Sequence, residues 1–79
     1  MSKWNLMHEV MDRFYKIERV GMISFEAHKD KLCVIVVVYG NKNDEELKNE
    51  LLKIEESIIR DFPELSLEFR YMSINEVMN

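Results

Sequence analysis

Seven consecutive apolar residues, Leu32 to Val38, interrupt a chain of 79 residues of which 33% are charged. The run is rich in β-branched side chains and is followed closely by Gly40, as is typical of a buried strand. Because successive side chains of a strand point to opposite faces of its sheet, this strand needs apolar cover on both sides. What covers each face is the main question that the sequence poses.

Two segments with alternating polarity flank this run along the chain. In residues 21–28, Ile23, Phe25 and Ala27 alternate with Ser24, Glu26 and His28, and in residues 65–71, Leu65, Leu67, Phe69 and Tyr71 alternate with Ser66, Glu68 and Arg70. Such alternation indicates strands with one buried face. The apolar run, which has no polar face, is therefore predicted to be the central strand. A short link predicts an antiparallel hairpin with the first strand, and a right-handed helical crossover would set the third strand parallel.

Two segments show the spacing of amphipathic helices. The first is predicted from Lys3 to about Val20, ending at Gly21, with Trp4, Met7, Met11 and Phe14 on its apolar side. The second is predicted from a capping box at Asn43 and Glu46 to about Asp61, before Pro63. A further capping box, Ser73 to Glu76, predicts either a single terminal turn or the start of a helix that continues beyond this chain. The expected fold class is α+β, ferredoxin-like α-β-β-α-β, with two helices on one face of a three-stranded sheet, as one domain over residues 1–79.

With both helices on one face, the other face of the central strand has no cover in this chain. We assign the uncovered side chains to Val34, Val36 and Val38, and the opposite alternation leaves Cys33, Ile35, Val37 and Tyr39 uncovered instead. An apolar stripe framed by polar strands predicts a dimer contact or a docking surface. An order with residues 21–28 in the centre is less favourable, because it would leave the apolar run on an exposed edge.

Composition restricts the classes of partner. The net charge of −4 argues against nucleic-acid binding and against binding to anionic membranes, since both need clustered Lys and Arg. The apolar run is far shorter than the roughly 20 residues of a membrane helix, so no direct membrane insertion is expected. The lone Cys33 has no partner for an internal disulfide, which favours a reducing, cytoplasmic location. A core this small favours a homodimer.

Candidate metal ligands occur as two pairs. His8 and Asp12 are four residues apart on the first helix, and Glu26 and His28 share the polar face of the first strand. A metal site takes three or four ligands, so each pair would need more, for instance from a second copy. The alternatives are a polar helix edge for the first pair and charges that protect a sheet edge for the second.

Other candidates for chemistry are weaker. Arg13, Lys16 and Arg19 are spaced three apart and suit a phosphate or an acidic partner, or else a solvated helix face with an internal Glu9 to Arg13 ion pair. Cys33, inside the apolar run, is expected to act as a small apolar residue. No phosphate-binding loop, nucleophile pattern or paired cysteine ligands occur, so the protein is not expected to be an enzyme.

One family shares the overall pattern. A helix, then "ERVGMISFEA", the apolar strand and "LLKIEESIIRDFPELSLEFRY" together resemble the C-terminal cytoplasmic domain of cation diffusion facilitator transporters. The resemblance covers about residues 8 to 72, and its best marker is Ile54 to Pro63. It implies a ferredoxin-like domain that dimerises through its sheet side, binds a divalent cation such as zinc, manganese or iron, and regulates a membrane transporter portion outside this chain.

The metal positions of that family are not matched. Where the family commonly carries histidines, this chain has Ile23, Val37, residues 47–49, and Phe69 with Arg70. Only His28 lies in a comparable neighbourhood. The expected function is a homodimeric cytoplasmic regulatory module of the metal-sensing type, and the alternative is a stand-alone protein-binding adaptor without a metal role.

Overall fold

The computed structural model describes residues 3–78, with side chains from residue 5 onward, so the side chain of Trp4 lies outside the described part. The fold is α+β, with three helices and a three-stranded mixed sheet. The elements are α1 (Lys3–Phe14), β1 (Val20–His28), β2 (Lys31–Val38), α2 (Glu45–Asp61), β3 (Leu67–Ser73) and α3 (Ile74–Met78). No helix within residues 3–78 is long and apolar enough to cross a membrane.

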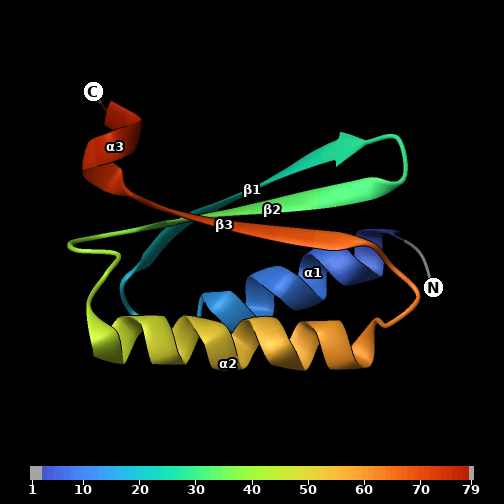
Figure 1. Ribbon diagram of the computed structural model, residues 1–79, viewed down its shortest axis with the longest axis horizontal. Coiled ribbons are helices and arrows are strands. Elements are labelled where there is room, and N and C mark those ends of the chain that lie inside the picture. The colour runs from blue at the N-terminus through green and yellow to red at the C-terminus, as the bar shows by residue number, and fades with distance from the viewer. Residues whose placement is uncertain (1–2, 79) are drawn as a thin grey trace.

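The apolar run forms the central strand, as predicted. β2 pairs antiparallel with β1 and parallel with β3, in the order β1-β2-β3. The tight turn after His28 permits the hairpin, and the crossover through α2 returns the chain to the other side of β2. α1 and α2 both lie against one face of the sheet, whereas α3 lies on the opposite side (Figure 1).

The alternation of side chains along β2 differs from the predicted assignment. Val34, Val36 and Val38 are fully buried in the core beneath α1 and α2. They belong to the same buried cluster as Phe14 and Ile58 and are closed to a second chain while the core is intact. The interface assignment to these valines is therefore corrected: Cys33, Ile35 and Val37 point to the face away from the helices. Because both sets are apolar, hydrophobicity alone did not distinguish them.

The first helix ends six residues earlier than predicted. After Phe14 the backbone forms turns whose hydrogen bonds span three residues instead of the four of an α-helix. The Ile17 amide donates to Phe14 O (3.0 Å) and the Val20 amide to Ile17 O (3.1 Å). These tight turns keep Ile17 against the core, so the helical spacing continues beyond the helix. Gly21 has a different role from a helix stop. It lies at a register irregularity in β1, where an added Cβ would stand 2.7 Å from the ring of Tyr39.

Side chains tie the helices and loops together. Arg13 of α1 donates to Glu9 (3.0 Å) and, across to α2, to Ser57 (3.1 Å) and Asp61 (2.7 Å). α2 begins one residue later than predicted, because its N-cap is Asp44, whose Oδ1 accepts from the Leu47 amide (3.1 Å). These bonds set α1 and α2 side by side over the sheet.

The predicted terminal turn is the short helix α3. The Ser73 amide donates to Glu76 Oε2 (2.7 Å), which is half of the expected capping box. The Ser73 hydroxyl instead accepts from the Lys42 amide (3.3 Å), and Lys42 Nζ pairs with Glu76 Oε1 (2.7 Å). α3 is thereby attached to the loop that precedes α2.

Two adjacent isoleucines of α2 provide a matched test of the core. Ile58 is 0% exposed, whereas Ile59 is 46% exposed. We expect Ile58→Ala to lower the free energy of unfolding by about 2–5 kcal/mol, because it removes buried methylenes and leaves a cavity. Ile59→Ala should cost roughly 1 kcal/mol or less. Urea denaturation measures both, and equal losses would contradict the orientation of α2.

The attachment of α3 should depend on pH. Hydrogen bonds from Lys42 and then from the Ser73 amide lower the pKa of Glu76 below the ordinary glutamate range. A depressed folded-state pKa stabilises the fold above the unfolded-state pKa, and this contribution is lost as the pH falls through the folded-state value. NMR titration should therefore show Glu76 and the Ser73 amide changing together in acid. Lys42→Met should raise the pKa of Glu76, and an unchanged titration in that variant would argue against the ion pair.

Candidate interaction surfaces

The face of the sheet away from α1 and α2 has an apolar end and a charged end. At one end Met22, Val37 and Met72 lie in a row across the three strands, and Ile35 follows on β2. Met22 is 45% exposed. α3 contacts β2 and β3 near this end, so part of the face has cover that the sequence prediction did not include. Met22 and Met72 were not predicted as surface candidates, although both share the face of the predicted polar residues.

The charged end of this face holds the predicted pair Glu26 and His28. The His28 Nε2 atom lies 4.0 Å from Glu26 Oε2, and both side chains are exposed. Glu68 of β3 stands on the other side of Cys33, but it is already paired with Lys31 (3.4 Å) and Arg70 (3.8 Å). Cys33 itself is buried beneath these side chains. A cation at Glu26 and His28 would therefore need further ligands.

Within residues 3–78, no three His, Cys, Asp or Glu residues are grouped so as to hold a metal ion. The other predicted pair, His8 and Asp12, lies on an exposed part of α1. The fold does not bring the two pairs together, because Glu26 and His28 face away from the helices. One chain thus offers at most two predicted ligands at each place.

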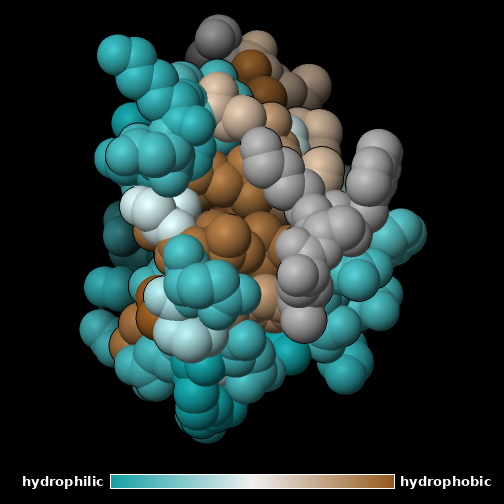
Figure 2. Space-filling view, turned by 90° about the vertical axis from the view of Figure 1, so that its right-hand side faces the viewer, coloured by the Kyte–Doolittle hydropathy of each residue, from teal (hydrophilic) through white to brown (hydrophobic). Residues whose placement is uncertain are grey.

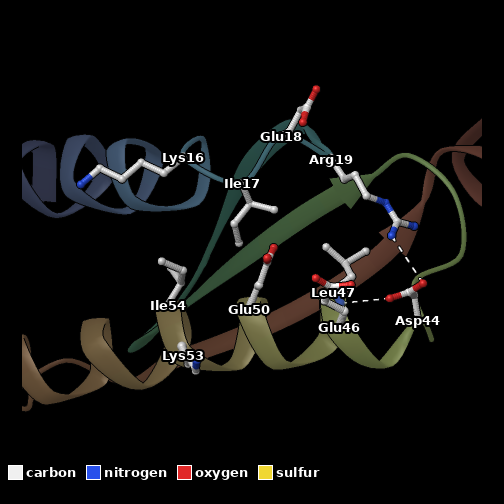
Figure 3. Close-up of a pocket in the computed structure, with 10 residues that line it drawn as sticks. All are labelled: Lys16, Ile17, Glu18, Arg19, Asp44, Glu46, Leu47, Glu50, Lys53 and Ile54. Atoms are coloured by element: carbon white, nitrogen blue, oxygen red, sulfur yellow. Dashed lines mark hydrogen bonds and ion pairs between the residues drawn. The ribbon is translucent and has the colours of Figure 1, made fainter.

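A hollow between the α1–β1 connection and α2 collects charges of both signs (Figure 3). Its apolar lining is Ile17, Leu47 and Ile54, and its charged residues are Lys16, Glu18, Arg19, Asp44, Glu46, Glu50 and Lys53. Arg19 turns toward Asp44 (3.7 Å) and also donates to Tyr39 O (3.0 Å) and Asn41 O (3.3 Å).

The predicted basic stripe of Arg13, Lys16 and Arg19 is therefore divided. Arg13 holds α2 and Arg19 holds the loop after β2, so Lys16 alone of these three makes no ion pair within the described residues. The two arginines have structural partners, and the hollow that Arg19 lines carries four acids. This arrangement does not favour an anion.

A second hollow lies between α2 and β3. Its lining includes Leu51, Leu52 and Tyr71. The Tyr71 hydroxyl donates to Glu55 Oε1 (2.7 Å) and joins the helix to the strand. Burial, then this hydrogen bond and the charge of Glu55, raise the pKa of Tyr71 above the ordinary phenol range. Leu52 remains 49% exposed beside it.

The end of the molecule near the hairpin turn carries a third apolar area, visible in the middle of Figure 2. A hollow there is lined by Leu6, Ala27, Leu32, Leu65, Leu67, Lys29, Asp30, Lys31 and Ser66. Its side chains offer apolar contact and a charged rim. They include a single carboxylate, which suits a contact surface better than acid–base chemistry.

Comparison with family models, with curated proteins and with solved structures found no match to this chain. The functional interpretation consequently depends on the surfaces themselves. Their exposed apolar residues include Met22 on the open face, Leu65 at the hairpin end, and Leu52 with Ile59 on α2. The last two were visible in the sequence as neighbours of the buried stripe, but apolar spacing did not reveal that they stay exposed.

Proposed function

We propose that this protein is a regulatory or interaction module that works as a homodimer. The observation that carries the proposal is the sheet face opposite the helices, where exposed Met22 lies in a row with Val37 and Met72. Apolar side chains grouped beside charged ones are typical of a contact surface. The small size of the chain favours a second copy, because additional buried area compensates for a limited core.

The most specific form of this proposal is the regulatory cytoplasmic domain of a divalent-cation transporter. The α-β-β-α-β order of the first five elements supports a ferredoxin-like arrangement, to which α3 is an addition. Glu26 and His28, 4.0 Å apart, supply the two ligands that one chain would contribute. Two such pairs would reach the number of ligands that zinc or manganese needs in a dimer that brings the two β1 strands together.

The solution mass tests self-association. Light scattering over a range of concentrations should give about twice the 9.5 kDa of one chain. The dimer should dissociate on dilution, because its stability depends on concentration. A mass of one chain at every concentration would contradict the homodimer and would favour a stand-alone adaptor that binds a different protein.

Thermal unfolding tests the cation. If zinc or manganese binds the folded dimer through Glu26 and His28, either ion should raise the melting temperature by mass action, and chelator should reverse the effect. The double variant Glu26→Ala, His28→Ala should lose the shift. His8→Ala is the matched control and should retain it. A shift that persists in the double variant would assign the ion elsewhere, and no shift in the wild type would contradict the metal-sensing form.

A further inference from the structure

β3 is an edge strand with one free side. The Leu32 amide donates to Ser66 O (3.0 Å), so the backbone groups of residues 66, 68, 70 and 72 face β2. The backbone groups of Leu67, Phe69 and Tyr71 consequently point away from the sheet. The Ser73 amide follows the same alternation, since it is bonded to Glu76 rather than to β2. Within residues 3–78, no strand pairs with this side of β3.

The two edges of the sheet differ in how well they are protected against the addition of another strand. β1 carries a register irregularity between Val20 and Met22, and such bulges discourage the addition of another strand. β3 pairs with β2 in unbroken register from Leu67 to Ser73 and contains no proline. The Glu76 cap protects its last residue only. A regular edge of this kind is suited to pairing with another strand.

We propose that a second copy of this chain adds to the free edge of β3 in antiparallel orientation, with Phe69 opposite the partner's Phe69. In that register Glu68 lies opposite the partner's Arg70, and Arg70 lies opposite the partner's Glu68. The sequence "LEFRY" is thus complementary to itself when read in reverse. Two identical ion pairs then form across the two-fold axis, as an interface between identical surfaces requires.

Charge selects this register over its neighbours. The backbone groups that point away from one β3 strand must hydrogen-bond with those that point away from the other. The alignment of the two strands can therefore shift only by two residues at a time. One such shift places Glu68 opposite the partner's Glu68, and the other places Arg70 opposite the partner's Arg70. Like charges directly opposite each other destabilise a strand pair. Of these three registers, only the one centred on Phe69 has attraction at both positions.

The helix side of the joined sheets adds apolar contact. There Leu67 would face the partner's Tyr71, while the two Phe69 rings would meet at the centre. α2 stands next to this edge, held by the bond between Tyr71 and Glu55. Its exposed side chains Leu52 and Ile59, 49% and 46% accessible, are seven residues apart and so share one side of the helix. The two-fold axis would place both copies of α2 on the same face of a continuous six-stranded sheet.

This inference rests on the proposed homodimer but places its contact at the β3 edge, so the two β1 strands, with Glu26 and His28, become the outer strands of the joined sheet and do not share a cation. Glu68→Arg and Arg70→Glu test it as a pair. In either variant alone, both cross-strand pairs become like-charged, so we expect the dimer dissociation constant to rise by about tenfold or more. When the two variants are mixed, an arginine of one chain again faces a glutamate of the other at both positions. Native mass spectrometry should then detect the heterodimer, which shows that each variant is folded.

Glu18→Arg is the matched control, since it makes the same charge change as Glu68→Arg at an exposed position in the connection between α1 and β1, away from β3. It should leave the dimer intact, with chelator present throughout. A wild-type chain that is monomeric would overturn both the proposed function and this inference. A wild-type dimer that persists in both single variants, or single variants that fail to form the heterodimer when mixed, would overturn the β3 contact alone.

Discussion

β2 is apolar on both faces, and the rest of the fold is arranged to meet that constraint. On one face Val34, Val36 and Val38 are enclosed by α1 and α2, which together with the sheet form the main core. On the other face Cys33 and Val37 are nearly as well buried, although no long helix covers them there. Side chains of the flanking strands lie over Cys33, and α3 contacts β2 near the Val37 end, so the strand order is inseparable from burial of the apolar run.

The sheet was predictable from the sequence because its signals are mutually consistent. β1 and β3 alternate in polarity and β2 does not, which specifies the centre, and the short link after His28 specifies the antiparallel pair. The orientation of β2 was not predictable, since Val36 and Val37 are equally apolar and only packing against α1 and α2 distinguishes them. The prediction therefore placed the uncovered side chains on the wrong face of the strand.

The errors in predicting where α1 ends and where α2 begins have a similar physical origin. Ile17 continues the apolar spacing of α1, yet the chain there is already turning toward β1, because tight turns keep its side chain on the core. Asn43 and Asp44 are both good N-caps, and local propensity does not choose between them. Arg19 was grouped with Arg13 by spacing, but the turn after α1 redirects it to the loop beyond β2.

Edge strands need a means of rejecting unrelated strands, and charged side chains are the usual one. Glu68 and Arg70 meet that need on β3, but their opposite signs have a second consequence. A strand with uniform charge would repel its own copy in every register. When two copies of β3 are paired, Glu68 and Arg70 around Phe69 place like charges opposite each other in the two adjacent registers. In the central register they place opposite charges together. The same residues that protect the edge would therefore favour a single alignment in the proposed pairing of two β3 strands, which is the property that a defined homodimer requires.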